Sequence, residues 1–423
     1  MSIRLGICGA GSFARSFIPL FKAHPLVREV LLCDQKPGIL QSCSKKYGIT
    51  KTCSSLDELV QSDVDAIAIF TQNWLHGPQA IQALKAGKHV YSAVPSAITL
   101  EEITALVRTV EQTGKIYMIG ETSYYYPCAI YCRDRFQKGD FGKIVYGEGE
   151  YYHDFDHGLY DVMKRRGGDQ WKNFAGCPPM YYPTHSTSMI VSVTGAHATH
   201  VSCLGFVDDH ADGLFRNGVN IWNNTFSNQT ALLRMSDGSM ARINEFRRIG
   251  HPGGERLSLY GTQGCYEEQT HSKIWTTKER ANCTDLSAAL ICSVSSAHGV
   301  IGIDPPIVSN VAKGSTRGRR TADKMSAPPS IIQHGLNKGA HQGMSSVHPV
   351  ASLPKEFAGL PNGHEGSHQF LVNDFVNACS GKKDPPNDVW AAARYLIPGL
   401  IAHQSALQGG AMLEIPDLHR STE

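Results

Sequence analysis

The chain has 423 residues, of which 41% are hydrophobic and 18% are charged, and its formal net charge is +2. This length exceeds the size at which a single hydrophobic core stops growing, so we expect two domains. No apolar run approaches the ~20 residues that span a bilayer, and the small net charge gives no sign of a nucleic-acid partner. We therefore expect a soluble globular protein with neither a membrane nor a nucleic-acid partner.

The start of the sequence enters a short apolar strand directly, without the basic region and long apolar region of a signal peptide. The 12 cysteines are scattered and form no Cys-x-x-Cys framework. That pattern favours reduced thiols over disulfides. Together these features predict a cytoplasmic protein.

The first predicted strand ends in a glycine turn that is typical of dinucleotide-binding sites. Residues 9–14 read G-A-G-S-F-A and precede an amphipathic stretch. Gly9 permits the tight turn, Gly11 lets the backbone approach a pyrophosphate, and the small Ala14 allows close packing of helix on strand. The cofactor contacts predicted in this turn are Gly9, Gly11, Ser12 and Phe13.

A second predicted strand, at residues 30–33, ends at Asp34. A carboxylate in this place accepts hydrogen bonds from the adenosine ribose hydroxyls and repels a 2′-phosphate. Asp34 therefore favours NAD over NADP as the cofactor, although the nearby Lys36 leaves NADP open.

Strand and helix patterns continue to alternate, with further strands predicted at residues 66–70, 89–92 and 116–119. This alternation predicts a parallel, doubly wound sheet with its ligand at the carboxyl ends of the strands. We place this Rossmann domain at residues 1–122. Further cofactor contacts are expected at Thr71, Asn73, His76, Val94, Pro95 and Glu121.

These motifs resemble the glucose-fructose oxidoreductase, inositol dehydrogenase and rhizopine-catabolism family (Gfo/Idh/MocA). The resemblance is carried by residues 9–11, 71–76, 86–90, the segment at Pro95, and residues 138–144 and 261–264. It implies a second domain built on a large open sheet, one face of which covers the nicotinamide end of the cofactor.

Strand-like runs from residue 144 onward agree with such a second domain. They lie at residues 145–152, 201–206, 225–235, 239–247 and 256–260, and helical stretches follow at 369–376 and 391–406. We predict an α/β Rossmann domain followed by an α+β domain, residues 123–423, with a large and mainly antiparallel sheet. The C-terminal helices, about 367–408, are expected to pack back on the first domain.

Two positions depart from the pattern of many family members. Where those members carry Glu-Lys-Pro the chain reads Ala93-Val94-Pro95, and where they carry Asp-x-x-x-His it has Tyr181 and His185. The combination is similar to the branch that contains NAD-dependent retaining glycosidases such as certain α-N-acetylgalactosaminidases. In that branch a hydride leaves ring carbon 3, the aglycone is eliminated, water adds and the hydride returns.

His185 is the predicted base for the substrate hydroxyl, because imidazole titrates near neutral pH and the family motif places a histidine there. Tyr181 would lie one turn away on the same face if Pro183 opens a helix. It is then either a second acid or base or a residue that orients the sugar.

Glu148 is the third predicted catalytic residue. It shares a strand face with Glu150, and the alternating Gly147 and Gly149 would leave room for a ligand. The predicted substrate contacts are Tyr152, His153, Tyr182 and His364. Arg165, Arg166 and Arg247 either clamp an anionic substrate or form surface salt bridges, and no metal is predicted.

The leading hypothesis is an NAD-dependent oxidoreductase that abstracts a hydride from a ring alcohol of a sugar or glycoside. A redox-neutral, NAD-dependent glycosidase is the alternative, and a non-catalytic NAD sensor is the third. The open sheet predicts a homo-oligomer, either a dimer or a tetramer. Residues 279–354 lack clear periodicity and form either a disordered segment or a lid or oligomer arm.

Overall fold

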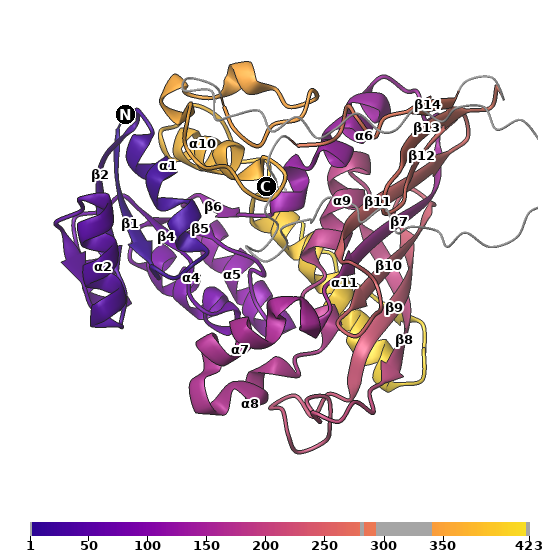
Figure 1. The fold of residues 1–423 in the computed structure, drawn as a ribbon, viewed down its shortest axis with the longest axis horizontal. Coiled ribbons are helices and arrows are strands. Elements are labelled where there is room, and N and C mark those ends of the chain that lie inside the picture. Colours follow the sequence, from indigo (N-terminus) through magenta and orange to yellow (C-terminus); the bar gives the residue numbers. More distant parts are fainter. Residues whose placement is uncertain (1, 280–282, 293–340, 420–423) are drawn as a thin grey trace, which may run out of the picture.

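The computed structural model describes residues 2–279, 283–292 and 341–419, and it contains two sheets with helices between them (Figure 1). The indigo N-terminal part carries the first sheet, and the large second sheet stands on the far side of the molecule. The segment predicted as a lid or oligomer arm falls mainly on residues 293–340, which lie outside the described residues.

The first sheet is parallel and has the strand order β3-β2-β1-β4-β5-β6. This is the order of a Rossmann fold, whose ligand crevice opens where the order reverses, between β1 and β4. The predicted doubly wound fold is confirmed. Its strands are β1 (Ile3–Cys8), β2 (Val27–Cys33), β3 (Thr52–Cys53), β4 (Ala66–Ile69), β5 (His89–Ser92) and β6 (Tyr117–Ile119).

The helices of this part follow local sequence signals, as α5 (Leu100–Thr113) illustrates. The side chain of Thr99 caps its first turn by accepting a hydrogen bond from the backbone of Glu102 at 3.1 Å. Gly114 ends it in the left-handed conformation, with φ 60°. The other helices here are α1 (Ile18–Ala23), α2 (Pro37–Tyr47), α3 (Leu56–Gln61) and α4 (His76–Lys85).

The second sheet has nine strands in the order β14-β13-β12-β11-β7-β10-β9-β8-β15. Neighbouring strands are antiparallel except for the parallel pair β7 and β10. The predicted large, mainly antiparallel sheet is confirmed. Its strands are β7 (Ile144–Tyr152), β8 (Ala198–Val207), β9 (Phe226–Met235), β10 (Met240–Phe246), β11 (Gly254–Gly261), β12 (Gly264–Glu268), β13 (Lys273–Thr277), β14 (Cys283–Asp285) and β15 (Leu413–Glu414).

Helices α9 (Thr184–Thr194) and α11 (Val389–Leu407) cover the face of this sheet that looks toward the first domain (Figure 1). Helix α11 also contacts α5, so it joins the two parts of the chain. In α10 (Ser367–Cys379), Phe370 and Phe375 share a buried cluster with Phe17 of the first domain. The remaining helices are α6 (Pro127–Gln137), α7 (Tyr160–Gly167) and α8 (Trp171–Ala175).

Helix α9 lies close to β7 because Gly149 has no side chain. A Cβ atom at Gly149 would lie 2.1 Å from the carbonyl oxygen of Ser186, in the first turn of α9. Gly147 faces the same helix, since its Cβ would lie 3.4 Å from the side chain of Ile190. These glycines therefore admit α9 to the sheet, where the sequence predicted room for a ligand.

Candidate active site

The centre of the site is a buried pair formed by His185, in the first turn of α9, and Glu121, which follows β6. The Nδ1 atom of His185 lies 2.6 Å from Oε1 of Glu121. The same carboxylate oxygen accepts hydrogen bonds from the backbone N and the Oγ of Ser123, at 3.0 and 2.8 Å. His185 is 2% exposed and Glu121 is fully buried. This pairing fixes the imidazole ring and directs Nε2 away from Glu121.

The pair carries opposite charges at neutral pH. Burial on its own lowers the pKa of His185, but the charge and hydrogen bond of Glu121, helped by Glu255 and Glu245, raise it to about 9. Burial favours the neutral form of Glu121, yet His185 and Ser123 together hold its pKa below the ordinary value. His185 therefore keeps a proton at neutral pH unless a nearby positive charge lowers its pKa.

Aromatic side chains surround the imidazole. The rings of Tyr151 and Tyr182 meet His185 edge-on, with centroids 5.2 and 5.4 Å away. The hydroxyl of Tyr151 lies 2.7 Å from Nδ1 of His153. The guanidinium of Arg247 stacks on the other side of Tyr151, 4.7 Å from the ring centroid. The structure thus brings two predicted substrate residues, His153 and Tyr182, to His185.

Three adjacent strands place a row of polar side chains beneath α9. Tyr151 of β7 pairs with Glu255 of β11 on one side and with Glu245 of β10 on the other. Residues paired across neighbouring strands share a face of the sheet. Because Tyr151 contacts His185, the two carboxyl groups face the site as well.

Glu245 is held on both of its oxygen atoms. One accepts a hydrogen bond from Oγ of Ser186 at 2.6 Å, and the other accepts from Arg247 at 2.9 Å. Burial dominates its titration and raises the pKa of Glu245 to about 7 against the opposing charge of Arg247. Glu245 therefore holds α9 and Arg247 in place from below.

Glu255 is held less completely. Its Oε1 atom is buried and makes no hydrogen bond within the described part of the chain. Burial raises the pKa of Glu255, with His185 opposing and Glu121 adding to the shift. A carboxyl group in this setting favours its protonated form and has an oxygen atom available to a ligand.

The sequence predictions did not single out Glu245 or Glu255, although alternation along the strands carried a signal. In β10 the inward positions Ala241 and Ile243 are buried and apolar, and Glu245 follows them in phase. In β11, Glu255 precedes the buried Leu257 in the same way. A carboxylate on the strand face whose other residues are buried and apolar indicates a functional role or an ion pair.

The prediction that Tyr181 shares a helical face with His185 is wrong. Tyr181 ends a separate 3-10 turn (Pro179–Tyr181), and α9 begins only at Thr184, so no helical turn joins the two residues. The ring of Tyr181 packs on His403 of α11, with centroids 5.2 Å apart. Tyr182 takes the place beside His185.

Glu148 and Tyr152 also lie away from this site, which corrects their predicted roles. Successive residues of a strand point to opposite faces, so both lie on the face opposite to Tyr151. Glu148 pairs with Arg242 at 3.3 Å, and Tyr152 stacks on Phe246 with centroids 5.0 Å apart. On β7, the positions that face α9 are occupied by Gly147 and Gly149.

The glycine turn of the first domain opens onto a cleft of about 420 Å³. Gly9 has φ 90°, and a Cβ there would lie 2.8 Å from the carbonyl oxygen of Phe70, so only glycine fits. At Gly11 a Cβ would meet nothing within 4 Å, which leaves the backbone open to a ligand. The predicted cofactor residues in the lining are Gly9, Gly11, Ser12, Phe13, Asp34 and Thr71.

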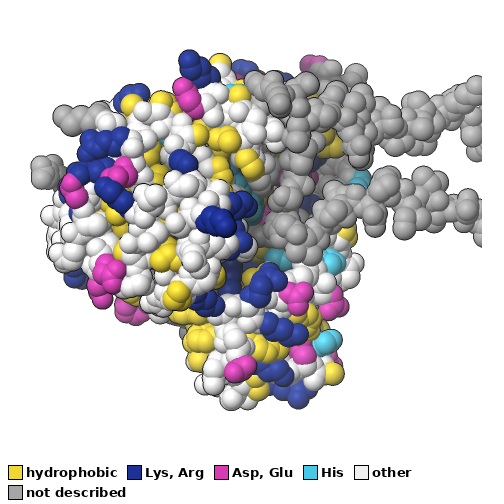
Figure 2. Space-filling model, turned by 60° about the vertical axis from the view of Figure 1, so that its left-hand side comes forward, with side chains coloured by type: hydrophobic (Ala, Val, Ile, Leu, Met, Phe, Trp, Pro, Cys, Tyr) yellow, Lys and Arg dark blue, Asp and Glu magenta, His cyan; other side chains and the backbone are white. Residues whose placement is uncertain are grey.

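The cleft fits a dinucleotide in shape and in its polar groups. Asp34 accepts hydrogen bonds from the backbone N of Ala10 and of Lys36, each at 2.8 Å, and these bonds hold the carboxylate at the end of β2. Figure 2 shows lysine and arginine side chains gathered around the hollowed middle of the molecule. Cationic side chains beside an exposed glycine backbone suit a phosphate-bearing ligand.

Other predicted cofactor residues lie behind the cleft. His76 is 2% exposed, and its ring nitrogens lie 2.8 Å from the carbonyl of Pro95 and 3.2 Å from that of Thr71. Burial lowers the pKa of His76 to about 4, so the ring is neutral. It connects the loop after β4 to the buried Val94 and Pro95, whereas Asn73 begins a 3-10 turn (Asn73–Leu75) beside it.

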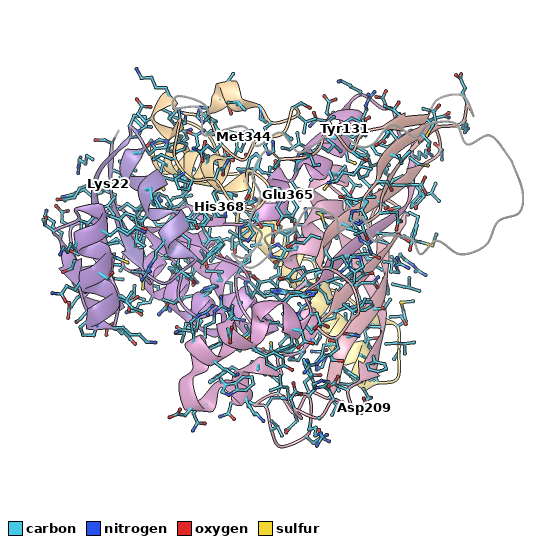
Figure 3. The ribbon with its side chains drawn as sticks, in the orientation of Figure 1. Lys22, Tyr131, Asp209, Met344, Glu365 and His368 are labelled. Carbon is cyan, nitrogen blue, oxygen red and sulfur yellow. The ribbon has the colours of Figure 1, made fainter. Side chains whose placement is uncertain are left out.

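His364 lies at the first domain, on the loop before α10. It adopts φ 46°, and its Nδ1 lies 2.8 Å from Nε2 of His368. Its ring meets Phe13 of the glycine turn edge-on at 5.5 Å. Figure 3 labels His368 and the neighbouring Glu365 between the first domain and the large sheet. His364 therefore joins the cofactor side of the site.

Within residues 2–279, 283–292 and 341–419, no group of three or more His, Cys, Asp or Glu side chains is arranged to hold a metal ion. The same search range contains no helix that is long and apolar enough to cross a membrane.

The first domain matches a known family model. Residues 3–121 match the oxidoreductase family with an NAD-binding Rossmann fold (GFO_IDH_MocA). The match begins with β1, includes the glycine turn and Asp34, and ends at Glu121.

Curated relatives carry names from glycosyl hydrolase family 109. A protein of Shewanella amazonensis is 29% identical over 43% of this chain and 42% of its own length. An α-N-acetylgalactosaminidase of Bacteroides fragilis is 34% identical over 32% of this chain and 33% of its own length. A family 109 protein of Solibacter usitatus is 25% identical over 99% of this chain and 89% of its own length. The first of these alignments thus spans less than half of the relative.

Solved structures share the fold along almost the whole chain. The myo-inositol 2-dehydrogenase of Lactobacillus plantarum has a TM-score of 0.66 at 19% identity, covering 98% of this chain and 100% of that one. A levoglucosan dehydrogenase in complex with NADH and levoglucosan has a TM-score of 0.69 at 14% identity, with the same coverage. Residues 3–121 thus match the NAD-binding Rossmann domain of the Gfo/Idh/MocA oxidoreductase family, and the chain as a whole is similar to a glycosyl hydrolase family 109 protein.

Proposed function

We propose that the chain is an NAD-dependent enzyme that removes a hydride from a ring secondary alcohol of a sugar or glycoside. Carbon 3 is the expected position by analogy with the family. The observation that carries this proposal is the buried pair of His185 and Glu121, which lies between the NAD-binding domain and the polar row of the large sheet.

Hydride acceptance is the chemistry that NAD supplies when it is bound at the cleft. His185 takes the proton of the substrate hydroxyl through Nε2, since Nδ1 is held by Glu121. The neutral imidazole is required for this step. A positive charge near the ring lowers the pKa of His185, so a cationic group at the cofactor site favours the base form.

The surrounding side chains bind and orient the sugar. Tyr182 and His153 present hydrogen-bonding groups to hydroxyls beside His185, and the stacked Tyr151 and Arg247 form the floor of the site. Glu245 keeps this floor rigid through its bonds to Ser186 and Arg247. Preorganised polar groups of this kind hold the reacting C–H bond in a productive orientation.

A redox-neutral glycosidase is the second candidate, and Glu255 is the residue that favours it. In that reaction, the ketone at carbon 3 acidifies the C–H bond at carbon 2. Solvent water takes that proton as the C1–C2 double bond forms and the C1–O bond to the aglycone breaks, and solvent returns a proton to carbon 2 when water adds. Glu255, whose pKa is raised by burial, supplies the proton that the aglycone oxygen needs. Water then adds across the double bond and the hydride returns to carbon 3.

One experiment separates the candidates. The protein, loaded with NAD, is incubated with natural and chromogenic glycosides while NADH absorbance and aglycone release are followed together. Stoichiometric NADH without aglycone supports the dehydrogenase and contradicts the glycosidase. Catalytic aglycone release without net NADH reverses that result, and NAD binding with neither signal favours the sensor.

The Glu255→Gln variant sharpens this test for the glycosidase. Loss of a proton donor slows aglycone release most for poor leaving groups and least for nitrophenolate, which departs without protonation. Early NADH formation in a single turnover should persist, because His185 remains. If Glu255→Gln slows the release of poor leaving groups and of nitrophenolate equally, the acid role of Glu255 is contradicted.

We also propose that the chain forms a homo-oligomer through the outer face of the large sheet. Leu204, Phe206 and Leu232 on that face are 64%, 59% and 56% exposed. Their places in the register put them on one face of β8 and β9. A contiguous apolar strip of this kind supports contact with a second copy.

A further inference from the structure

Helices α7 and α8 belong to a segment, residues 155–176, that reaches from the large sheet to the cofactor domain. We call it the bridging segment. On the side of the second domain, Tyr160 donates a hydrogen bond to Asp212 and accepts one from Arg248 at 2.8 Å. At its other end, the ring of Phe174 stacks on Trp74 with centroids 4.2 Å apart and an angle of 12°. The segment is therefore anchored to both domains.

The last turn of α7 places two arginines at the dinucleotide cleft. Arg165 and Arg166 line the same cleft as Gly11 and Asp34. Within the described part of the chain, neither guanidinium takes part in a hydrogen bond or ion pair. The surface salt bridges that were one prediction for these residues are therefore not present within the described residues.

Arg166 also lies within electrostatic reach of the groups at the inner end of the cleft. Burial is the main reason for the low pKa of His76, and the charge of Arg166 adds to that lowering. Burial raises the pKa of Tyr182, and the same charge opposes the rise. Arg166 therefore lines the cofactor cleft and lies near enough to Tyr182, the ring that packs on His185, for its charge to act on it.

The charge of the cleft calls for an anionic ligand. Its lining includes Arg15, Lys36, Arg165 and Arg166 against the single carboxylate of Asp34. The glycine turn continues through a 3-10 turn (Ala14–Ser16) into α1, which has only six residues, so the helix dipole at the cleft is short. Side-chain cations are thus needed to balance the two phosphates of a dinucleotide.

We propose that Arg165 and Arg166 bind the pyrophosphate of the dinucleotide, so that the cofactor is held by both domains. This role differs from that of an anionic-substrate clamp. It deepens the proposed function, because it rests on the cleft being the NAD site, but it does not depend on which reaction follows. The bridging segment then couples cofactor binding to the position of the second domain.

The test measures binding and needs no substrate. Isothermal titration of the full chain with NAD, ADP-ribose and adenosine is compared for wild type, Arg165→Ala, Arg166→Ala and the double variant. Each single variant should raise the Kd for NAD and ADP-ribose about tenfold, since a charge-assisted hydrogen bond contributes about 1.5 kcal/mol or more. Binding of adenosine, which lacks phosphate, should change less than about twofold.

Lys164→Ala is the matched control, because Lys164 lies in the same turn of α7 and does not line the cleft. It should leave the Kd for NAD unchanged. Circular dichroism checks that each variant folds. Replacement of the exposed arginines should not affect folding. Unchanged NAD binding by the double variant, or equal weakening for NAD and adenosine, would overturn the proposal. A wild-type chain that binds no NAD would instead contradict the proposed function itself.

Discussion

Among the single residues of the site, two carboxyl groups have pKa values that are shifted in opposite directions. Glu121 is ionised because an imidazole and Ser123 stabilise its charge, whereas burial and a nearby like charge favour the protonated form of Glu255. Environments that push pKa values apart in this way separate an acid from a base. His185 is the base in this assignment and Glu255 is the acid.

The pH dependence of hydride abstraction tests the base. Because neutral His185 is required and its pKa without cofactor is about 9, kcat/KM of the NAD-loaded wild type should rise with pH and level off at or below that value, since a positive charge near the ring lowers the pKa. In Glu121→Gln the imidazolium loses its partner, so the rise should move to lower pH, and the plateau should fall. The measurement is the pH profile of NADH formation. If the pH profile of Glu121→Gln is the same as that of the wild type, this assignment is contradicted.

The corrected position of Glu148 is tested by Glu148→Gln. Because Glu148 lies on the outer sheet face and pairs with Arg242, this variant should keep hydride abstraction within about threefold of wild type. Initial rates of NADH formation at saturating substrate provide the measurement. A rate of NADH formation lower by a hundredfold or more, which is the effect of removing a general base, would support the catalytic role predicted from the sequence.

Glu245 is expected to contribute mainly to stability. Its removal takes the carboxylate partner from Arg247, which is 8% exposed and keeps its contacts with the carbonyl of Phe246 and the ring of Tyr151, so Glu245→Ala should lower the free energy of unfolding by about 3 kcal/mol. Urea unfolding followed by circular dichroism measures the change. Glu29→Ala, which removes an exposed pair with Lys51, should cost less than about 1 kcal/mol. Similar losses for the two variants would contradict the role given to Glu245.

At the scale of elements, the position of α9 on β7 decides where His185 lies. The backbone of Ser186 sits where a side chain at Gly149 would be, so the helix and strand are in contact without an intervening layer. The histidine is fixed by this contact as much as by its hydrogen bond to Glu121. Any residue larger than glycine at this position must displace the helix.

Gly149→Ala should therefore reduce activity about a hundredfold, because a shift of about 1 Å misplaces a catalytic group to that extent. The melting temperature should fall as well, since overpacking strains the contact. Gly38→Ala is the control, because a Cβ there meets nothing within 4 Å and its φ is not positive. NADH formation and thermal unfolding provide the readouts. Wild-type values for Gly149→Ala would show that α9 is not so constrained.

The sequence predicted the helices and strands well. It predicted less well on which face of a helix or strand each side chain lies. The alternation of strands and helices and the glycine turn were sufficient for the two sheets, and the family motif located His185. The roles of Tyr181 and Glu148 depended on where a helix begins and on which strand face is covered. Those features are set by Pro183 and by the packing of α9 on Gly149, which periodicity does not reveal. Glu255 needed the pairing of β11 with β7 to become visible.

In the whole molecule, helices fill the space between the two sheets, and no helix of the described residues covers the outer face of the large sheet (Figure 1). We expect the wild type to sediment as a dimer or tetramer. The double variant Leu204→Glu and Leu232→Glu places charges on this face and should shift the protein toward the monomer. Analytical ultracentrifugation measures this. A wild-type monomer, or a variant with unchanged mass, would contradict the proposed interface.

The central claim is that His185 abstracts a proton from a sugar ring alcohol while a hydride passes to NAD. Its most direct test is a single-turnover comparison of NAD-loaded wild type and His185→Ala, with substrates identified from the glycoside panel. We expect NADH formation by the wild type and a loss of at least about a thousandfold in His185→Ala, with the Kd for NAD unchanged. NADH formation by His185→Ala at the wild-type rate would contradict the claim.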